Sequence, residues 1–138
     1  MDIFTKKKRS EIMRSVRSKD TKPELSIRRF LMSKKVWYKK HVSELPGKPD
    51  IVIPRIRHVV QVNGCFWHHH KGCKRAVFPK TNVRYWRNRL NENINRDIEN
   101  EIYLNEMGWT TVVVWECEAN KKRKPKKLYE MVRSYHEK

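Results

Sequence analysis

Asp50-Ile-Val-Ile-Pro-Arg-Ile-Arg-His-Val-Val-Gln-Val62 is the stretch that decides the fold, because two short apolar segments flank a proline turn within it. Isoleucine and valine, which favour an extended backbone, make up most of residues 50–53 and 58–62. Pro54 and Arg55 stand between them, where a turn is expected. The stretch therefore predicts two successive strands of a sheet.

Upstream of these strands the sequence predicts one helix and one further strand. The helix opens with Thr21 as its N-cap and Pro23 in its first turn, where a proline is tolerated. Its inward-facing residues are Ile27, Phe30 and Leu31. Residues 36–42 have the composition of a strand, and a turn at residues 45–49 leads from it to Asp50.

Downstream of these strands, helical and strand patterns alternate again. Thr81 is placed to cap a long helix that reaches about Met107 and ends at Gly108. Residues 110–115 form an apolar run typical of a buried strand. A short C-terminal helix follows, with one side made of Leu128, Met131, Val132 and Tyr135. The alternation predicts an α/β fold.

The chain has 138 residues, the size of one ordinary domain with room for one hydrophobic core. We therefore expect a single domain over residues 1–138. Residues 1–20 carry seven Lys or Arg side chains, and we expect them to form a partly mobile basic arm. Residues 118–138 are expected to form a basic linker and the C-terminal helix.

The charge balance points to a polyanionic partner. Lys and Arg number 33 against 15 Asp and Glu, giving a formal charge of +18. Duplex nucleic acid fits this excess best, because neutralising its phosphates releases condensed counterions. No apolar run approaches the roughly 18 residues that cross a bilayer, and the N-terminus lacks the apolar core of a signal peptide. We therefore expect a cytoplasmic protein, associated with the bacterial nucleoid and without a membrane partner.

The segment Cys65-Phe-Trp-His-His-His-Lys-Gly-Cys73 concentrates thiols, imidazoles and aromatic rings directly after a predicted strand. Thiolate and imidazole are the ligands of structural zinc, and Cys117, just past the strand at residues 110–115, supplies a third thiol. We expect a zinc site with three cysteines and one histidine that ties this loop to a neighbouring strand end. Local geometry leaves both His68 and His70 eligible as the fourth ligand, and three buried structural cysteines are the alternative.

Asp50 is a candidate metal ligand of another kind. It follows Pro49 at the start of a strand, where a carboxylate can hold Mg2+ together with waters and a substrate phosphate. The next strand can run alongside and offer a backbone carbonyl from residues 60–62 to the same ion. The alternative is an aspartate that only shapes the turn.

Short motifs occur in a fixed order from residue 9 to residue 117, most of the chain. They are Asp20-Thr-Lys-Pro-Glu24, Leu45-Pro-Gly-Lys-Pro-Asp50-Ile-Val, Val62-Asn-Gly-Cys-Phe-Trp-His-His-His70, Tyr85-Trp86, Asn93-Ile-Asn-Arg-Asp97 and Val112-Val-Val-Trp-Glu-Cys117. Each motif is weak by itself, but the ensemble is highly specific. Through it the chain resembles the very-short-patch-repair (Vsr) DNA mismatch endonuclease family.

The resemblance implies both a fold and an activity. The fold would be similar to the restriction-endonuclease-like PD-(D/E)xK core, a mixed β-sheet flanked by α-helices, with a structural zinc site. The activity would be a Mg2+-dependent nick in double-stranded DNA beside the thymine of a T:G mismatch, the lesion left when 5-methylcytosine deaminates. Such a nick starts very short patch repair, so mismatch-repair factors are further partners to test, and we expect a monomer.

The resemblance also implies roles for single residues. Asp50 would bind Mg2+ through its carboxylate and Val62 through its main-chain carbonyl. His68 would be the general base or a phosphate contact, oriented by Asp97, and Glu24 would lie in the water shell of the ion. For Glu24 the alternative is a capping box with Thr21, and for Asp97 an exposed helical carboxylate.

Two further groups of residues match the family. The zinc ligands would be Cys65, His70, Cys73 and Cys117. The aromatic rings that wedge into the base stack beside the mismatch would be Phe66, Trp67 and Trp86. Packing in the core or against the zinc loop is the alternative for these rings.

The chain departs from the wider nuclease superfamily at one element. Gln61-Val-Asn63 replaces the Glu-x-Lys element, so the usual pair of metal-binding carboxylates is missing. The Vsr family lacks that element as well, and a histidine takes over the chemistry. Asn63 stands where some members carry an additional histidine, and its amide cannot act as a general base near neutral pH.

Three rival functions stay open at this point. One is a nicking endonuclease with relaxed mismatch or sequence specificity, and another is a zinc-stabilised DNA-binding module without cleavage. The third has the histidine cluster hold a catalytic zinc, which would make Cys73 and Cys117 dispensable.

Overall fold

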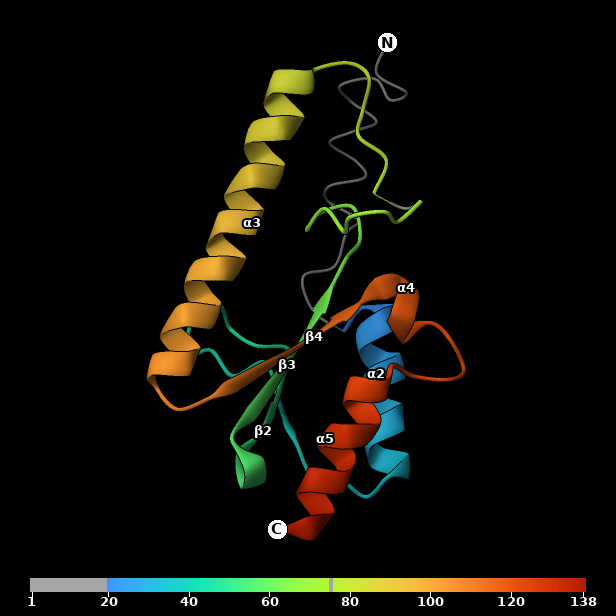
Figure 1. Ribbon diagram of the computed structural model, residues 1–138, viewed down its shortest axis with the longest axis vertical. Helices are drawn as coiled ribbons and strands as arrows, with labels where there is room; N and C mark the ends of the chain where they lie inside the picture. Colours follow the sequence, from blue (N-terminus) through green and yellow to red (C-terminus); the bar gives the residue numbers. More distant parts are fainter. Residues whose placement is uncertain (1–19, 75) are drawn as a thin grey trace.

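The computed structural model describes residues 20–74 and 76–138. In these ranges the chain forms a four-stranded sheet with helices on both sides (Figure 1). The elements are α2 (Lys22–Ser33), β1 (Lys39–Lys40), β2 (Ile51–Ile53), the 3₁₀ turn η1 (Pro54–Ile56), β3 (His58–Asn63), α3 (Val83–Glu106), β4 (Thr110–Trp115), α4 (Glu116–Ala119) and α5 (Lys126–Glu137).

The strands lie in the order β1-β2-β3-β4. The first two pairings are antiparallel and the third, between β3 and β4, is parallel, so the sheet is mixed. Residue 51 faces residue 60 across the β2–β3 pair, and residue 62 faces residue 114 across the β3–β4 pair. The predicted α/β class is therefore confirmed, and the stretch from Asp50 to Val62 does form the two inner strands.

One face of the sheet is covered by α2 and α5 (Figure 1). Alternate strand residues point to this face because successive side chains of a strand point to opposite sides. The strand residues of this core are Ile51, Ile53, Val60 and Val114. Ile27 and Leu31 of α2 meet them, as predicted, together with Leu128 and Met131 of α5.

The opposite face is covered by α3 over part of its area. Leu104, near the C-terminal end of α3, packs on Val52 and Val59 and closes a small second core. Towards its N-terminus α3 extends beyond the strands in Figure 1. The strand residues next along this face are mainly polar, Gln61, Asn63 and Thr111 among them, and they line a cleft between α3 and the sheet.

Three local predictions need correction. Asn82, not Thr81, takes the cap position of α3, because it adopts a left-handed backbone (φ 54°) and its carbonyl accepts the Trp86 N–H. The strand expected over residues 36–42 pairs only at Lys39–Lys40, since His41 is also left-handed (φ 53°) and breaks the extended run. β4 spans the predicted residues but lies on a half-open edge, so it is mostly half-buried.

The C-terminal segment begins as a linker and ends in the predicted helix, α5. One of its lysines has a structural position, since the Lys124 ammonium donates to the Ser26 hydroxyl and to the carbonyls of Ala119 and Lys121 at 2.7–2.8 Å. The basic arm predicted at the N-terminus lies, apart from Asp20, outside the described residues. In the described ranges, none of the helices combines the length and the apolar character that a bilayer crossing requires.

Candidate active site and metal centre

A cleft of about 630 Å3 lies between α3, the sheet and the start of α2. Its lining includes the five residues predicted for catalysis and Mg2+ binding: Glu24, Asp50, Val62, His68 and Asp97. These residues come from the start of α2, from β2 and β3, from the loop after β3 and from α3. The fold therefore brings together side chains that are up to 73 residues apart in sequence.

Asp50 immediately precedes β2, on the α3 side of the sheet. Its Oδ2 accepts a hydrogen bond from the Val62 N–H at 2.8 Å, so the residue before β2 is bonded to the backbone near the end of β3. Burial raises the pKa of Asp50 to about 7, and the neighbouring Glu24 carboxyl adds to the rise. The contact between Asp50 and Val62 runs through the Val62 amide, and the role expected for the Val62 carbonyl stays a prediction.

Replacing Asp50 by asparagine should stabilise the Mg2+-free protein above pH 7. The pKa of Asp50 is about 7 in the fold against an ordinary 3.8, so the folded state keeps a proton that the unfolded chain has released. The stability that this proton contributes is complete below pH 4 and is lost as the pH rises to 7 and above. The charged carboxylate then costs on the order of 2–4 kcal/mol, which an uncharged amide of the same shape avoids.

Thermal unfolding of the zinc-loaded protein at pH 4.5 and pH 8 measures this effect. The gain from Asp50→Asn should be clear at pH 8 and small at pH 4.5. Asp20→Asn is a matched control of opposite sign, because Arg28 and His41 hold the pKa of Asp20 below its ordinary value. Equal gains for Asp50→Asn at both pH values would contradict the raised pKa.

Glu24 is the most deeply buried carboxylate of the cleft, with 1% of its surface exposed. Its backbone N–H donates to the Thr21 hydroxyl at 3.4 Å, as the predicted cap requires. The return bond of a standard capping box would go to the Thr21 N–H. Instead the Glu24 carboxylate accepts from the Asp20 N–H at 2.5 Å. Capping and a place in the cleft are therefore compatible.

The loop after β3 is held against α3 by two side chains one helical turn apart. Asp97 accepts a hydrogen bond from His68 Nδ1 at 2.5 Å, and Asn93 Nδ2 donates to the Trp67 carbonyl at 2.9 Å. Because an ionised carboxylate only accepts, the neutral form of His68 carries its proton on Nδ1 and a lone pair on Nε2. His68 thus carries the group that a general base needs.

The three aromatic residues predicted as wedges form one cluster. The Phe66 ring lies 5.1 Å from Trp67 and 5.5 Å from Trp86, both edge-on, and the two indoles are 6.0 Å apart. Phe66 and Trp67 are half-buried and line the cleft, whereas Trp86 is only 5% exposed.

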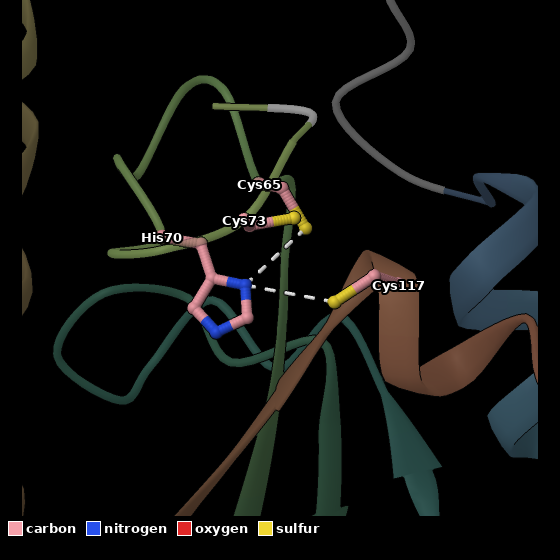
Figure 2. A group of neighbouring side chains, drawn as sticks. All are labelled: Cys65, His70, Cys73 and Cys117. Atoms are coloured by element: carbon pink, nitrogen blue, oxygen red, sulfur yellow. Dashed lines mark hydrogen bonds between the residues drawn. The ribbon is translucent and has the colours of Figure 1, made fainter. Parts of the chain in front are cut away.

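A second group of side chains gathers beside the cleft. Figure 2 shows Cys65, His70, Cys73 and Cys117 turned toward one another. Their ligand atoms all lie within 4.8 Å of each other, with His70 Nδ1 3.7 Å from the sulfur of Cys65 and 3.5 Å from that of Cys117. All three cysteines lie in the described part of the chain, and no disulfide joins them.

The donor set fits a structural zinc ion. Three sulfurs and one imidazole nitrogen are the ligands of closed tetrahedral zinc sites. Burial raises the pKa of the Cys65 thiol to about 12, so its thiolate needs a cation beside it. His70 is held by stacking on the Trp115 ring, with centroids 4.2 Å apart. The two histidines left open by local geometry are thus separated: His70 lies with the cysteines and His68 in the cleft.

Sequence reasoning missed three polar residues around Glu24: Asp20, Arg28 and His41. Arg28 had a detectable signal, because residues four apart on a helix are neighbours and Glu24 precedes it by four. His41 had none, since only the pairing of β1 with β2 brings it to this place.

Comparison with known proteins gives consistent matches over most of the chain. The family model described as DNA mismatch endonuclease Vsr matches residues 1–75. The type II nicking enzyme V.NmeAIP of Neisseria meningitidis is 43% identical over 121 residues, which cover 88% of this chain and 86% of that relative. The type II nicking enzyme V.XorIIP of Xanthomonas oryzae is 42% identical over 86% of this chain and 87% of its own length. The DNA mismatch endonuclease Vsr of Escherichia coli K12 is 34% identical over 84% of this chain and 74% of its own length.

Proposed function

Because this chain belongs to the Vsr family of DNA mismatch endonucleases, we propose that it nicks one strand of duplex DNA beside the thymine of a T:G mismatch. The nick would be Mg2+-dependent and would start very short patch repair of deaminated 5-methylcytosine. The observation that carries this proposal is the cleft in which Asp50, Glu24 and the His68–Asp97 pair meet. The mixed sheet with flanking helices also supports a restriction-endonuclease-like core.

The oxygens around Asp50 fit Mg2+, which prefers carboxylate, carbonyl and water ligands. The ion would be held by the Asp50 carboxylate and the Val62 carbonyl, with Glu24 in its water shell. Mg2+ bound there would neutralise charge on the scissile phosphate and lower the pKa of a bound water. The raised pKa of Asp50 fits such a site, because a carboxylate buried beside another gains most from a cation.

His68 would remove a proton from the attacking water. Its Nδ1 proton is engaged by Asp97, so Nε2 is the atom that accepts the proton. A protonated His68 is near enough to Asp50 to lower the Asp50 pKa, which supports a base beside the proposed ion site. The water oxygen then bonds to phosphorus as the bond from phosphorus to the 3′-oxygen breaks. The 3′-oxygen takes up a proton from solvent, and the ends are a 5′-phosphate and a 3′-hydroxyl.

The DNA would lie across the cleft and a neighbouring hollow. This hollow, of about 500 Å3, shares His68, Asp97 and the cation Lys48 with the cleft and adds a second cation, Arg96. Their charges suit the phosphates that flank the scissile one, and the excess of 33 basic over 15 acidic residues favours the duplex generally. This surface therefore supports DNA as the substrate.

The aromatic cluster would supply the preference for a mismatch. Phe66 and Trp67 are accessible enough to enter the base stack, while insertion of Trp86 requires the cluster to open. Unstacking costs a few kcal/mol per step and least where pairing is already poor. A T:G pair would thus be opened more easily than a matched pair.

The Cys65, His70, Cys73 and Cys117 group would hold structural zinc. Zinc there would keep His68 and the two aromatic residues of the same loop at a set distance from Asp50. Localisation at the bacterial nucleoid, a monomeric state and help from mismatch-repair factors belong to the same proposal.

A second candidate function is nicking with relaxed specificity. It is favoured by the names of the relatives from Neisseria and Xanthomonas, which are type II nicking enzymes, at 43% and 42% identity. Catalytic residues alone do not select the base pair that is opened.

Strand nicking of matched and T:G-containing duplexes, with Mg2+ present or withheld, tests both candidates. We expect a Mg2+-dependent nick of the T:G duplex and its loss in Asp50→Ala by about 1,000-fold or more, since a metal ligand is removed. Glu130→Ala is the control, because it removes a carboxylate on the exposed side of α5. The absence of a nick on any duplex would refute the proposed endonuclease activity. Equal nicking of both duplexes would leave only the second candidate, a nuclease with relaxed specificity.

A further inference from the structure

Three polar side chains outside the proposed mechanism surround the Glu24 carboxylate. Asp20 precedes α2, Arg28 lies one turn further along α2, and His41 follows β1. Asp20 and Arg28 belong to the segment of Glu24 itself and His41 to a separate one, and all three converge on a group that is 1% exposed. A buried charge is stable only when it is paired and hydrogen-bonded, so this convergence needs an account.

The distances describe one connected network. The Arg28 guanidinium, itself only 7% exposed as a residue, lies 2.9 Å from Asp20 Oδ1 and 3.9 Å from Glu24 Oε2. His41 Nε2 lies 3.4 Å from Asp20 Oδ1 and 3.5 Å from Glu24 Oε2. The Glu24 carboxylate thus accepts a hydrogen bond from the Asp20 N–H and has the Arg28 guanidinium and the His41 imidazole beside it.

His41 links this network to the proposed ion site through the backbone. Its own N–H donates to the Asp50 carbonyl at 3.1 Å, while its side chain faces Glu24. The left-handed backbone at His41 allows both contacts at once, and left-handed residues other than glycine are uncommon. His41 therefore contacts the backbone of Asp50 and the carboxylate of Glu24 at once.

A second cation site is the obvious competing explanation, because Asp20, Glu24 and His41 place ligand atoms within 4.8 Å of one another. The guanidinium of Arg28 already serves as the cation for these carboxylates. A divalent ion in the same place would have to displace it or lie against its charge. The group is therefore better explained as a support for Glu24 than as a metal site.

We infer that Arg28 and His41 are positioning residues that hold the Glu24 carboxylate beside Asp50, where it orders water ligands of the catalytic ion. The inference rests on the proposed Mg2+-dependent function. Outer residues that orient a metal site usually change ion affinity or activity by about 10- to 100-fold when they are replaced. Arg28→Met and His41→Leu should therefore weaken ion binding while the protein stays folded.

Two readouts on the zinc-loaded full chain test the inference. The first readout is a titration with Mn2+, which accepts the same oxygen ligands as Mg2+. Electron paramagnetic resonance measures the free Mn2+ in this titration directly, in the absence of DNA, and so gives the ion affinity. The Mg2+ concentration for half-maximal nicking of the T:G duplex is the second readout. The Mn2+ dissociation constant and the Mg2+ midpoint should both rise about tenfold or more in Arg28→Met and His41→Leu, and less in Arg28→Lys. Arg29→Met is the matched control, because Arg29 is the adjacent but exposed arginine of α2.

A double replacement separates positioning from general damage. If Arg28 acts through Glu24, adding Arg28→Met to Glu24→Gln should change the Mn2+ affinity by less than about twofold, because coupled residues are not additive. Additive losses would overturn the inference. Should Arg28→Met fail to fold, Arg28→Lys and His41→Leu carry the same comparison.

The outcomes also distinguish this inference from the proposed function. A wild-type nick with unchanged ion affinity and Mg2+ midpoint in folded Arg28→Met and His41→Leu would overturn the inference alone. If the wild type nicks no duplex, the proposed function fails, and the Mn2+ titration still decides whether Arg28 and His41 support an ion site.

Discussion

His68→Ala should lower the rate of nicking of the T:G duplex by about 100- to 10,000-fold, the range that general acid–base catalysis contributes. The proposed reaction needs a lone pair beside the attacking water, and His68 Nε2 provides it while Nδ1 is bonded to Asp97. Single-turnover nicking at saturating Mg2+ and protein measures the chemical step apart from binding. DNA affinity should change little, because the overall positive charge stays almost the same.

His69→Ala is the matched control for this result. His69 is the next residue of the same loop, but its ring lies edge-on to Phe78 instead of lining the cleft. Asp97→Asn should give an intermediate loss, because an amide can still contact the imidazole but does not favour the same tautomer. A His68→Ala variant that nicks as fast as His69→Ala would exclude His68 as the base.

Cys117→Ser should remove zinc, destabilise the fold by at least about 3 kcal/mol and reduce nicking to the level of His68→Ala. Structural zinc contributes on the order of 10 kcal/mol in small zinc-finger peptides, and less is expected here because the sheet has its own core. Cys117 belongs to α4, whereas the other three ligands belong to the loop after β3, so the ion would close a long connection across the fold.

Zinc content per chain and thermal unfolding measure this second effect. Wild type, His68→Ala and His69→Ala should each hold one zinc ion, and Cys117→Ser should hold none. If Cys117→Ser keeps its zinc and its full nicking rate, the structural role of this site is wrong. The possibility of a catalytic zinc would then return.

Local patterns predicted most of the fold. The apolar runs and the turn residues between them predicted β2 and β3 correctly, and the cap at Thr21 predicted α2. These features depend on near neighbours in the chain. The predictions failed where a left-handed residue redirects the backbone, at His41 and at Asn82. Neither residue is a glycine, and although Asn and His adopt this backbone more often than most residues, the sequence carried only a weak signal for the change.

The site was predictable to a different degree. The sequence alone left His68 and His70 as equal zinc candidates, and the family resemblance favoured His70, which the geometry of the cluster supports. The contact of His68 with Asp97 also depends on tertiary packing, since 29 residues separate them. Arg28 and His41 were missed because their function depends on a neighbour, Glu24, whose capping pattern gave a sufficient local explanation.

Helix α3 has a consequence for where the DNA is cut. Trp86, one of the predicted wedge residues, packs on another, Phe66. Asn93 and Asp97 hold the loop that carries His68. The outer two of these helix positions, 86 and 97, are 11 residues apart, a rise of about 16 Å on one rigid helix. In the proposed function the helix would set the distance between the mismatch and the bond that is broken. Lengthening it by one residue would turn one end about 100° from the other and separate recognition from cleavage.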